Sequence, residues 1–180
     1  SMVNLTPDDP VTIEELSPGA NLTNTDLSGI DLSGINLTDA DLMHADLEGA
    51  NLSDATLASA DFYAANLDDA NLTDTDLTGA DLTNAQLEGA DLTGADLTGA
   101  DLTGAYFSDN DLTGVTLDDT RLRDVKFRRC DITDLDTVDL GGVDLYYLRF
   151  DMQRWSPDLT DANLSSADLR KSDFGKGDFK

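Results

Sequence analysis

A five-residue unit repeats through most of this sequence and limits what the chain can fold into. From Leu22 to Ile132 every fifth residue is Leu, Phe or Ile, which makes 23 consecutive positions. The residue two places before each of these is small or apolar, most often Ala, and the residue between them is mostly Asp or Asn. A period of five fits neither an amphipathic helix, with apolar residues at i, i+3, i+4 and i+7, nor a strictly alternating strand.

Each unit predicts a short extended segment followed by a turn. The two apolar residues share one face of the extended segment, and the Asp or Asn between them points to the other face. The remaining two residues, usually Ser or Thr followed by Gly, Asp or Asn, have turn chemistry. Because the chain bends the same way in every unit, we expect a solenoid with Leu and Ala inside, whose coils pair about 4.8 Å apart.

A sample of the A(D/N)LXX pattern, from Ala90 to Asp109, reads ADLTGADLTGADLTGAYFSD. This pattern closely resembles the pentapeptide repeat family, and the resemblance covers roughly residues 20–179. It implies an all-β fold, a right-handed quadrilateral β-helix with four units per coil. Residues four units apart in the sequence would then stack on one another.

Residues 1–19 do not repeat and are predicted to form an N-terminal cap. Asp9 and Pro10 have the chemistry of a helix N-cap and first helical position, and Glu14 and Glu15 follow in the first turn. We therefore expect a short helix that covers the open end of the coil, because solenoids need capped ends.

Residues 20–180 form the predicted repeat domain, whose phase slips twice. Ile132 and Leu140 are eight residues apart, and Phe150 and Leu159 are nine residues apart, which predicts bulges or short loops near 133–139 and 151–158. A repeat unit runs to Phe179 without a visible C-terminal cap. An open end of this kind either pairs with a second chain or results from truncation, and we predict end-to-end dimerisation to a homodimer.

Four-unit stacking makes further predictions about individual side chains. Phe107 should lie against Phe127 inside the coil, Met43 should lie beside Tyr63 outside, and Asn110 should point inward and bond to the backbone, since buried polar groups need partners. A candidate acidic interaction column faces outward and comprises Asp41, Asp61, Asp81 and Asp101, and Arg121 continues it.

The charge is large and uneven. The net charge is −26, and residues 1–120 contain 25 Asp and Glu but no Lys or Arg. This excludes direct nucleic-acid binding by the acidic part, which would repel phosphates. It would instead attract basic surfaces. We also expect the rod to be stabilised by salt, because stacked carboxylates repel one another.

Catalytic and metal chemistry find little support in the sequence. The single histidine, His44, is predicted at an outward turn, and the single cysteine, Cys130, at an inward position where it acts as a small buried apolar residue. We predict no enzyme activity, no cofactor and no specific metal site. With no apolar run of about 20 residues and no signal-peptide pattern, we expect no membrane association and a cytoplasmic location.

A basic and aromatic cluster near the C-terminal part is a second candidate contact surface. Arg and aromatic side chains concentrate at interfaces, although pairing with neighbouring acidic columns explains the basic residues more simply. The cluster comprises Arg121, Arg123, Lys126, Arg128, Arg129, Tyr146, Tyr147 and Trp155.

Two functions remain open. Some pentapeptide repeat proteins, of the Qnr and MfpA type, mimic DNA and bind DNA gyrase or topoisomerase IV. Residues 20–119 carry 21 acids over five coils of about 24 Å in total, roughly one charge per 1.1 Å against about 1.7 Å in duplex DNA. The alternative is a well-solvated, salt-adapted scaffold of undefined partner, because the acids are spread almost evenly around the four sides.

Overall fold

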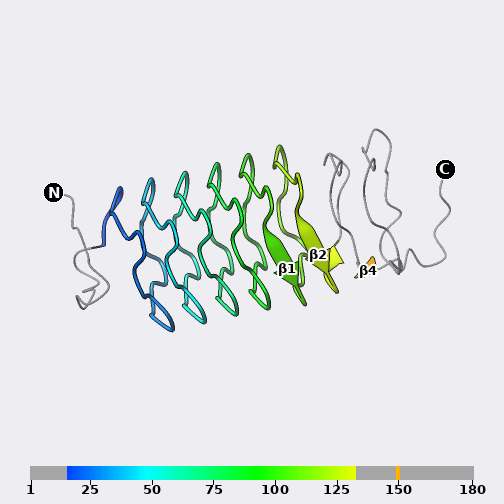
Figure 1. Cartoon of the computed structure of the whole chain (residues 1–180), viewed down its shortest axis with the longest axis horizontal. Coiled ribbons are helices and arrows are strands. Elements are labelled where there is room, and N and C mark those ends of the chain that lie inside the picture. The colour runs from blue at the N-terminus through cyan, green and yellow to red at the C-terminus, as the bar shows by residue number, and fades with distance from the viewer. Residues whose placement is uncertain (1–15, 133–148, 151–180) are drawn as a thin grey trace.

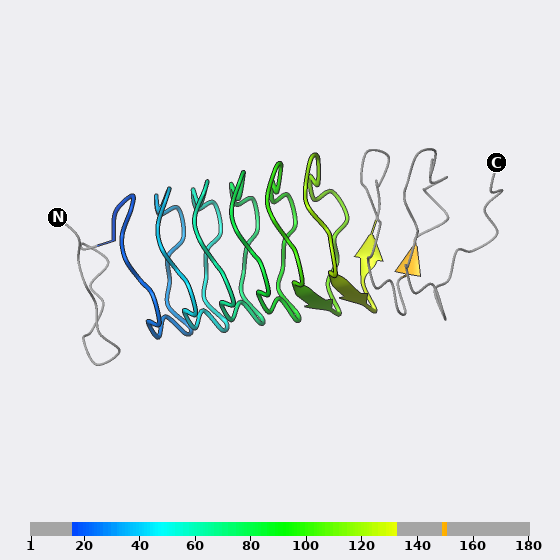
Figure 2. The same ribbon diagram turned by 45° about the horizontal axis from the view of Figure 1, so that its top comes forward.

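The computed structural model describes residues 16–132 and 149–150 of the chain. Over residues 16–132 the backbone winds in successive coils that are stacked along the long axis of the molecule (Figure 1). A second view, turned about that axis, shows the same stack of coils with turns projecting at their corners (Figure 2). The predicted solenoid is confirmed for these residues. The predicted N-terminal helix lies outside the described residues.

Neighbouring coils are joined by parallel backbone pairs between residues 20 positions apart. Asn21 pairs with Asp41, Asp26 with Asp46, and the same step continues down four columns of bridges. Four units of five residues therefore close each coil. The residue that pairs is in every case the outward one, between the two inward apolar residues. Its backbone makes the inter-coil contact while its side chain faces out.

Two pairs of short strands lie near the end of the described coils. Strand β1 (Tyr106–Ser108) pairs in parallel with β2 (Lys126–Arg128), at the usual step of 20 residues. Strand β3 (Asp131–Ile132) pairs in parallel with β4 (Arg149–Phe150), and here Ile132 lies opposite Phe150. That step is shorter by two residues, as the eight-residue spacing in the sequence predicts. The positions of both predicted slips lie outside the described residues.

Each unit ends in a turn that needs a left-handed residue. In most units the inward Leu carbonyl accepts the N–H of the residue three positions later, as Leu42 does from Ala45 at 3.0 Å. The second residue of the turn has positive φ in every unit from Leu22 to Phe127. Gly, Asn and Asp tolerate this conformation best, which explains why they dominate the last position of the unit.

The core is a continuous ladder of inward side chains from Ala20 to Cys130, and nearly all of them are buried. Each buried Leu contributes roughly 2 kcal/mol, so the ladder holds a slender coil together without a thick core. Phe107 and Phe127 stack as predicted, with ring centroids 5.0 Å apart and planes at 29°. Within the part of the chain that the structure describes, no helix is long and apolar enough to cross a membrane.

Candidate protein-interaction surface

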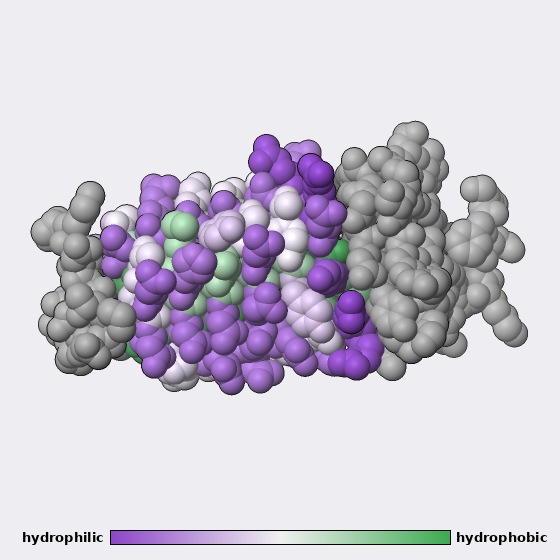
Figure 3. Space-filling view, viewed as in Figure 1, coloured by the Kyte–Doolittle hydropathy of each residue, from purple (hydrophilic) through white to green (hydrophobic). Residues whose placement is uncertain are grey.

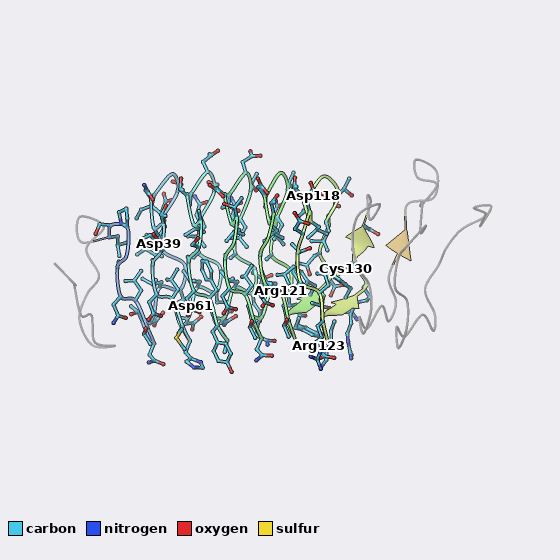
Figure 4. All side chains as sticks on the ribbon, turned by 90° about the horizontal axis from the view of Figure 1, so that it is seen from above. Asp39, Asp61, Asp118, Arg121, Arg123 and Cys130 are labelled. Carbon is cyan, nitrogen blue, oxygen red and sulfur yellow. The ribbon has the colours of Figure 1, made fainter. Side chains whose placement is uncertain are left out.

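The predicted acidic column is present on one face of the rod. The backbones of Asp41, Asp61, Asp81 and Asp101 pair in succession, and the next pair joins Asp101 to Arg121. All four carboxylates are partly exposed. Figure 4 shows Asp61 and Arg121 along one side of the rod and Asp39 and Asp118 along another. We call Asp41, Asp61, Asp81 and Asp101 the acidic column.

The position of each column aspartate is set by its own turn. One carboxylate oxygen accepts the backbone N–H two residues later, at 3.1 Å for Asp41 with Met43 and 3.0 Å for Asp101 with Thr103. Asn makes the same bond elsewhere, as Asn36 does with the N–H of Thr38 at 3.1 Å. This is an Asx turn, which either residue can form. The turn therefore explains the choice of Asp or Asn, but it does not explain the negative charge.

In other columns an Asn stacks on an Asp of the neighbouring coil. Its neutral amide donates a hydrogen bond to the carboxylate, so no like charges meet there. Asn51 donates from Nδ2 to Asp31 Oδ1 at 3.1 Å, and Asn66 donates to Asp46 Oδ1 at 3.1 Å. The acidic column has no Asn between its first and last aspartate. The backbones that carry its carboxylates pair in succession, at the strand spacing of about 4.8 Å, and like charges at that separation in water repel by about 1 kcal/mol. The column therefore keeps a repulsion that Asn would remove at no loss to the turn.

The column ends in an ion pair. Arg121 Nη1 lies 3.1 Å from Asp101 Oδ2, and the arginine side chain is largely exposed. Burial raises the pKa of Asp101, but hydrogen bonds from the Thr103 hydroxyl and amide, together with Arg121, outweigh it and lower the pKa overall. An exposed pair of this kind contributes little stability. It marks the end of the uninterrupted negative charge.

A second acidic group was not predicted as a site from the sequence. Asp68 is half-buried, and burial raises its pKa, with added repulsion from Glu88, Asp69 and Asp46; the Glu88 N–H, 2.8 Å from Asp68 Oδ1, opposes this rise. Glu48, Asp68 and Glu88 occupy equivalent positions in three successive coils. Counting in steps of 20 residues would have found this group in the sequence.

The basic cluster lies mainly in ion pairs with nearby acids. Arg129 Nη2 lies 2.6 Å from Asp109 Oδ2, in the coil before it. Arg123 Nε lies 3.5 Å from Asp124. The Arg128 guanidinium lies 5.9 Å from the centre of the Tyr106 ring. The simpler interpretation, pairing with acidic neighbours, is consistent with these contacts, and a role in partner binding stays a prediction. Tyr146, Tyr147 and Trp155 lie outside the described residues.

Two inward polar residues meet at the end of the ladder. Asn110 is 2% exposed and donates from Nδ2 to the carbonyls of Leu87 and Ala90, at 2.7 and 2.9 Å, so the predicted backbone bonding is confirmed. Cys130 (labelled in Figure 4) is buried, as predicted, and its Sγ lies 3.8 Å from Asn110 Oδ1. Burial raises the pKa of the Cys130 thiol to about 11. The thiol is therefore protonated and poorly reactive at neutral pH.

One face of the coils is mainly polar. On the face shown in Figure 3, hydrophilic residues cover most of the coils, and paler or apolar residues show only between them. His44 is exposed, as predicted. Among the residues that the structure describes, no group of three or more His, Cys, Asp or Glu is arranged to hold a metal ion. The main chemical feature of the described surface is therefore its extended array of carboxylates.

The comparisons with known proteins agree with the repeat seen in the coil. The family model for pentapeptide repeats (8 copies) matches residues 20–58, 55–94, 90–129 and 157–180. The chain belongs to the pentapeptide repeat family. As a member of that family it is a right-handed β-helix, a fold built for structural and interaction roles. A direct comparison with curated proteins finds no significant match.

Solved structures of other pentapeptide repeat proteins share the fold. The protein Rfr23 from the cyanobacterium Cyanothece 51142 is 29% identical, with a TM-score of 0.50; the match covers 62% of this chain and 86% of Rfr23. Trypsin-treated QnrB1, a plasmid-mediated fluoroquinolone resistance protein, is 18% identical, with a TM-score of 0.58; the match covers 87% of this chain and 84% of QnrB1. At that identity the likeness to QnrB1 concerns the fold.

Proposed function

We propose that this pentapeptide repeat protein is a non-enzymatic binding rod that presents closely spaced negative charge to a cationic, DNA-binding surface of another protein. The observation that carries the proposal is the acidic column. Asn would satisfy each of its turns equally well and would remove the repulsion between coils. Carboxylates kept at such a spacing are accounted for if a cationic partner compensates them, because complementary charge speeds and orients association.

The partner we would test first is DNA gyrase, with topoisomerase IV as its relative. Both hold duplex DNA against a basic surface, and the charge along residues 20–119 is at least as dense as that of a duplex. QnrB1, which shares the fold, is a fluoroquinolone resistance protein. This motivates the choice of partner, and the charge spacing supplies the physical argument for it.

The experiment is inhibition of gyrase supercoiling by the full chain, titrated at low and at moderate salt. The test variant changes all four aspartates of the acidic column to Asn, which keeps every Asx acceptor. We expect at least about a tenfold weaker inhibition, since several charge contacts are lost together. Inhibition by the unchanged chain should also fade as salt rises, because screening shortens the range of the interaction.

The matched control removes the same number of charges elsewhere. Each of its four aspartates also accepts a backbone N–H two residues later, so the turns are preserved. The control changes Asp31, Asp76, Asp91 and Asp96 to Asn. If it weakens inhibition as much as the column variant, the net charge rather than the column matters. If the unchanged, folded chain does not inhibit at either salt, gyrase is not the partner.

A solvated scaffold is the second candidate function. The observation that favours it is the spread of the acids over all four sides of the coil, because charge on every side serves solubility and needs no partner to account for it. A salt-adapted scaffold would lose stability at low ionic strength and bind no topoisomerase. Urea unfolding across a range of NaCl concentrations, run beside the supercoiling assay, separates the two. The predicted C-terminal dimer would be tested by light scattering.

A further inference from the structure

Two neighbouring turns on the face of the acidic column depart from the residues that the turn favours. The first turn position holds Ser or Thr in most units, and the hydroxyl often bonds to the outward Asp, as Thr103 Oγ1 does to Asp101 Oδ1 at 2.6 Å. Met43 and Tyr63 occupy this position in two successive coils. Neither side chain can make that bond in its unit, so local turn chemistry does not account for them.

The second turn position departs in the same two units. It is left-handed in every unit and is usually Gly, Asn or Asp, yet here it is His44 with φ 55° and Ala64 with φ 52°. In this conformation the Cβ crowds the following carbonyl, so both residues are unfavourable choices for the backbone. Residues that break local rules together in one place are often functional.

These four residues form one surface, which we call the Met43–Tyr63 patch. The His44 N–H donates to the Tyr63 carbonyl at 2.9 Å, and the two rings meet edge to face with centroids 5.6 Å apart. Met43, Tyr63 and Ala64 are partly exposed and His44 is exposed. The outward residues of the same two units are Asp41 and Asp61, whose backbones pair directly. An aromatic and thioether surface is thus flanked by two carboxylates.

We propose that the Met43–Tyr63 patch is the point on the rod where a cationic protein surface docks most tightly. Tyr, Met and other large side chains are enriched at interfaces and dominate binding energy there. Arg side chains suit this patch because their stems pack on Tyr63 and Met43, the guanidinium interacts with an aromatic ring, and its charge meets Asp41 or Asp61. The absence of Lys and Arg before Arg121 leaves nothing on these coils to repel such a surface.

This proposal rests on the proposed function only in requiring a cationic protein partner, whichever protein that is. The test variants are Tyr63→Thr and Met43→Thr in the full chain. Both variants should keep the fold, because Thr83 and Thr103 already occupy the equivalent position on the same face. The matched control is Tyr106→Thr, which removes a partly exposed tyrosine from strand β1 on another face.

Two measurements test the docking patch and the identity of the partner independently. The first is an NMR titration of the labelled full chain with a short peptide of alternating Arg and Leu. We expect the amide shifts to concentrate in residues 41–44 and 61–64 and to disappear from them in Tyr63→Thr. The second is binding to immobilised gyrase, where Tyr63→Thr should weaken affinity at least about tenfold and Tyr106→Thr should not.

Each outcome decides one of the two claims. Shifts spread evenly along all four faces, or gyrase binding equally strong in Tyr63→Thr, would overturn the patch while leaving the acidic rod as a binder. Shifts confined to the patch without any gyrase binding would support the patch and exclude gyrase as the partner. Concentration-dependent self-association that Tyr63→Thr abolishes would assign the patch to a second copy of this chain and also overturn the proposal.

Discussion

Replacing Asn110 with Ala is expected to destabilise the rod, although Ala is the usual residue at this inward position. The column that contains Asp91 and Asp111 shows why. Backbone pairs join Asn71 to Asp91 and Asp111 to Asp131, but within the described residues no such pair joins Asp91 to Asp111. The Asn110 amide donates to the Ala90 carbonyl at this gap. The side chain therefore takes the place of a missing inter-coil backbone bond.

The expected magnitude follows from the contacts that are lost. The Leu87 carbonyl keeps a second donor, the Ala90 N–H at 3.1 Å. The Ala90 carbonyl would lose the donor that the structure shows for it, and an unsatisfied buried acceptor costs about 1–3 kcal/mol. We expect a loss of about 2 kcal/mol in the free energy of unfolding from these terms.

Thr75→Ala is the matched control, because it also changes a buried inward polar residue to Ala. The Thr75 hydroxyl donates to the Leu72 carbonyl at 2.7 Å, but that carbonyl also accepts the Thr75 N–H at 3.3 Å. The carbonyl stays satisfied, so the loss should stay below about 1 kcal/mol.

The measurement is urea unfolding followed by circular dichroism and by tyrosine fluorescence, because repeat proteins can lose their coils in steps that a single probe misses. Amide hydrogen exchange at Leu92 and Asp111 reports on the gap directly, because a backbone pair across it would use these two N–H groups. An Asn110→Ala protein as stable as the unchanged chain, with protected amides at these residues, would refute the reasoning. It would mean that the coil relaxes to form the backbone pair when the side chain is removed.

Three further predictions concern single side chains. Ala64→Gly should raise the free energy of unfolding by about 0.5–1 kcal/mol in urea melts, because relief of the left-handed strain exceeds the added freedom of the unfolded chain; a loss of stability would contradict this. Asp68→Asn should stabilise the rod by about 0.5 kcal/mol at neutral pH. Because the folded pKa of Asp68 is raised from its ordinary value of 3.8, the advantage should develop as pH rises from that value through the folded pKa and vanish at lower pH; an advantage independent of pH would refute the electrostatic cause. Cys130 should react with iodoacetamide in the folded chain far more slowly than in urea, since its thiol is buried with a pKa of about 11; equal rates would show that the end of the ladder is open.

Several features of the candidate site could be predicted only once the coil length was fixed. The acidic column and the stacking of Phe107 on Phe127 follow from four units per coil, which the family resemblance supplied and the 20-residue pairing confirms. The environment of Asp68 could have been found by the same counting, but it depends also on burial, which the sequence pattern does not give. The gap bridged by Asn110 is a departure from the regular register, and a regular pattern cannot predict where it fails.

The sequence by itself determined which side chains point inward, since a five-residue period with Leu and Ala two positions apart allows one orientation of each unit. It also determined where the turns lie, because Gly, Asn and Asp recur at the last position of the unit and tolerate its left-handed conformation. Tertiary structure alone decided which carboxylates stack on one another in a column, which accept a bond from Asn, and which are paired with Arg. These relations join residues about one coil apart, and they depend on how the coil closes and stacks rather than on any local preference.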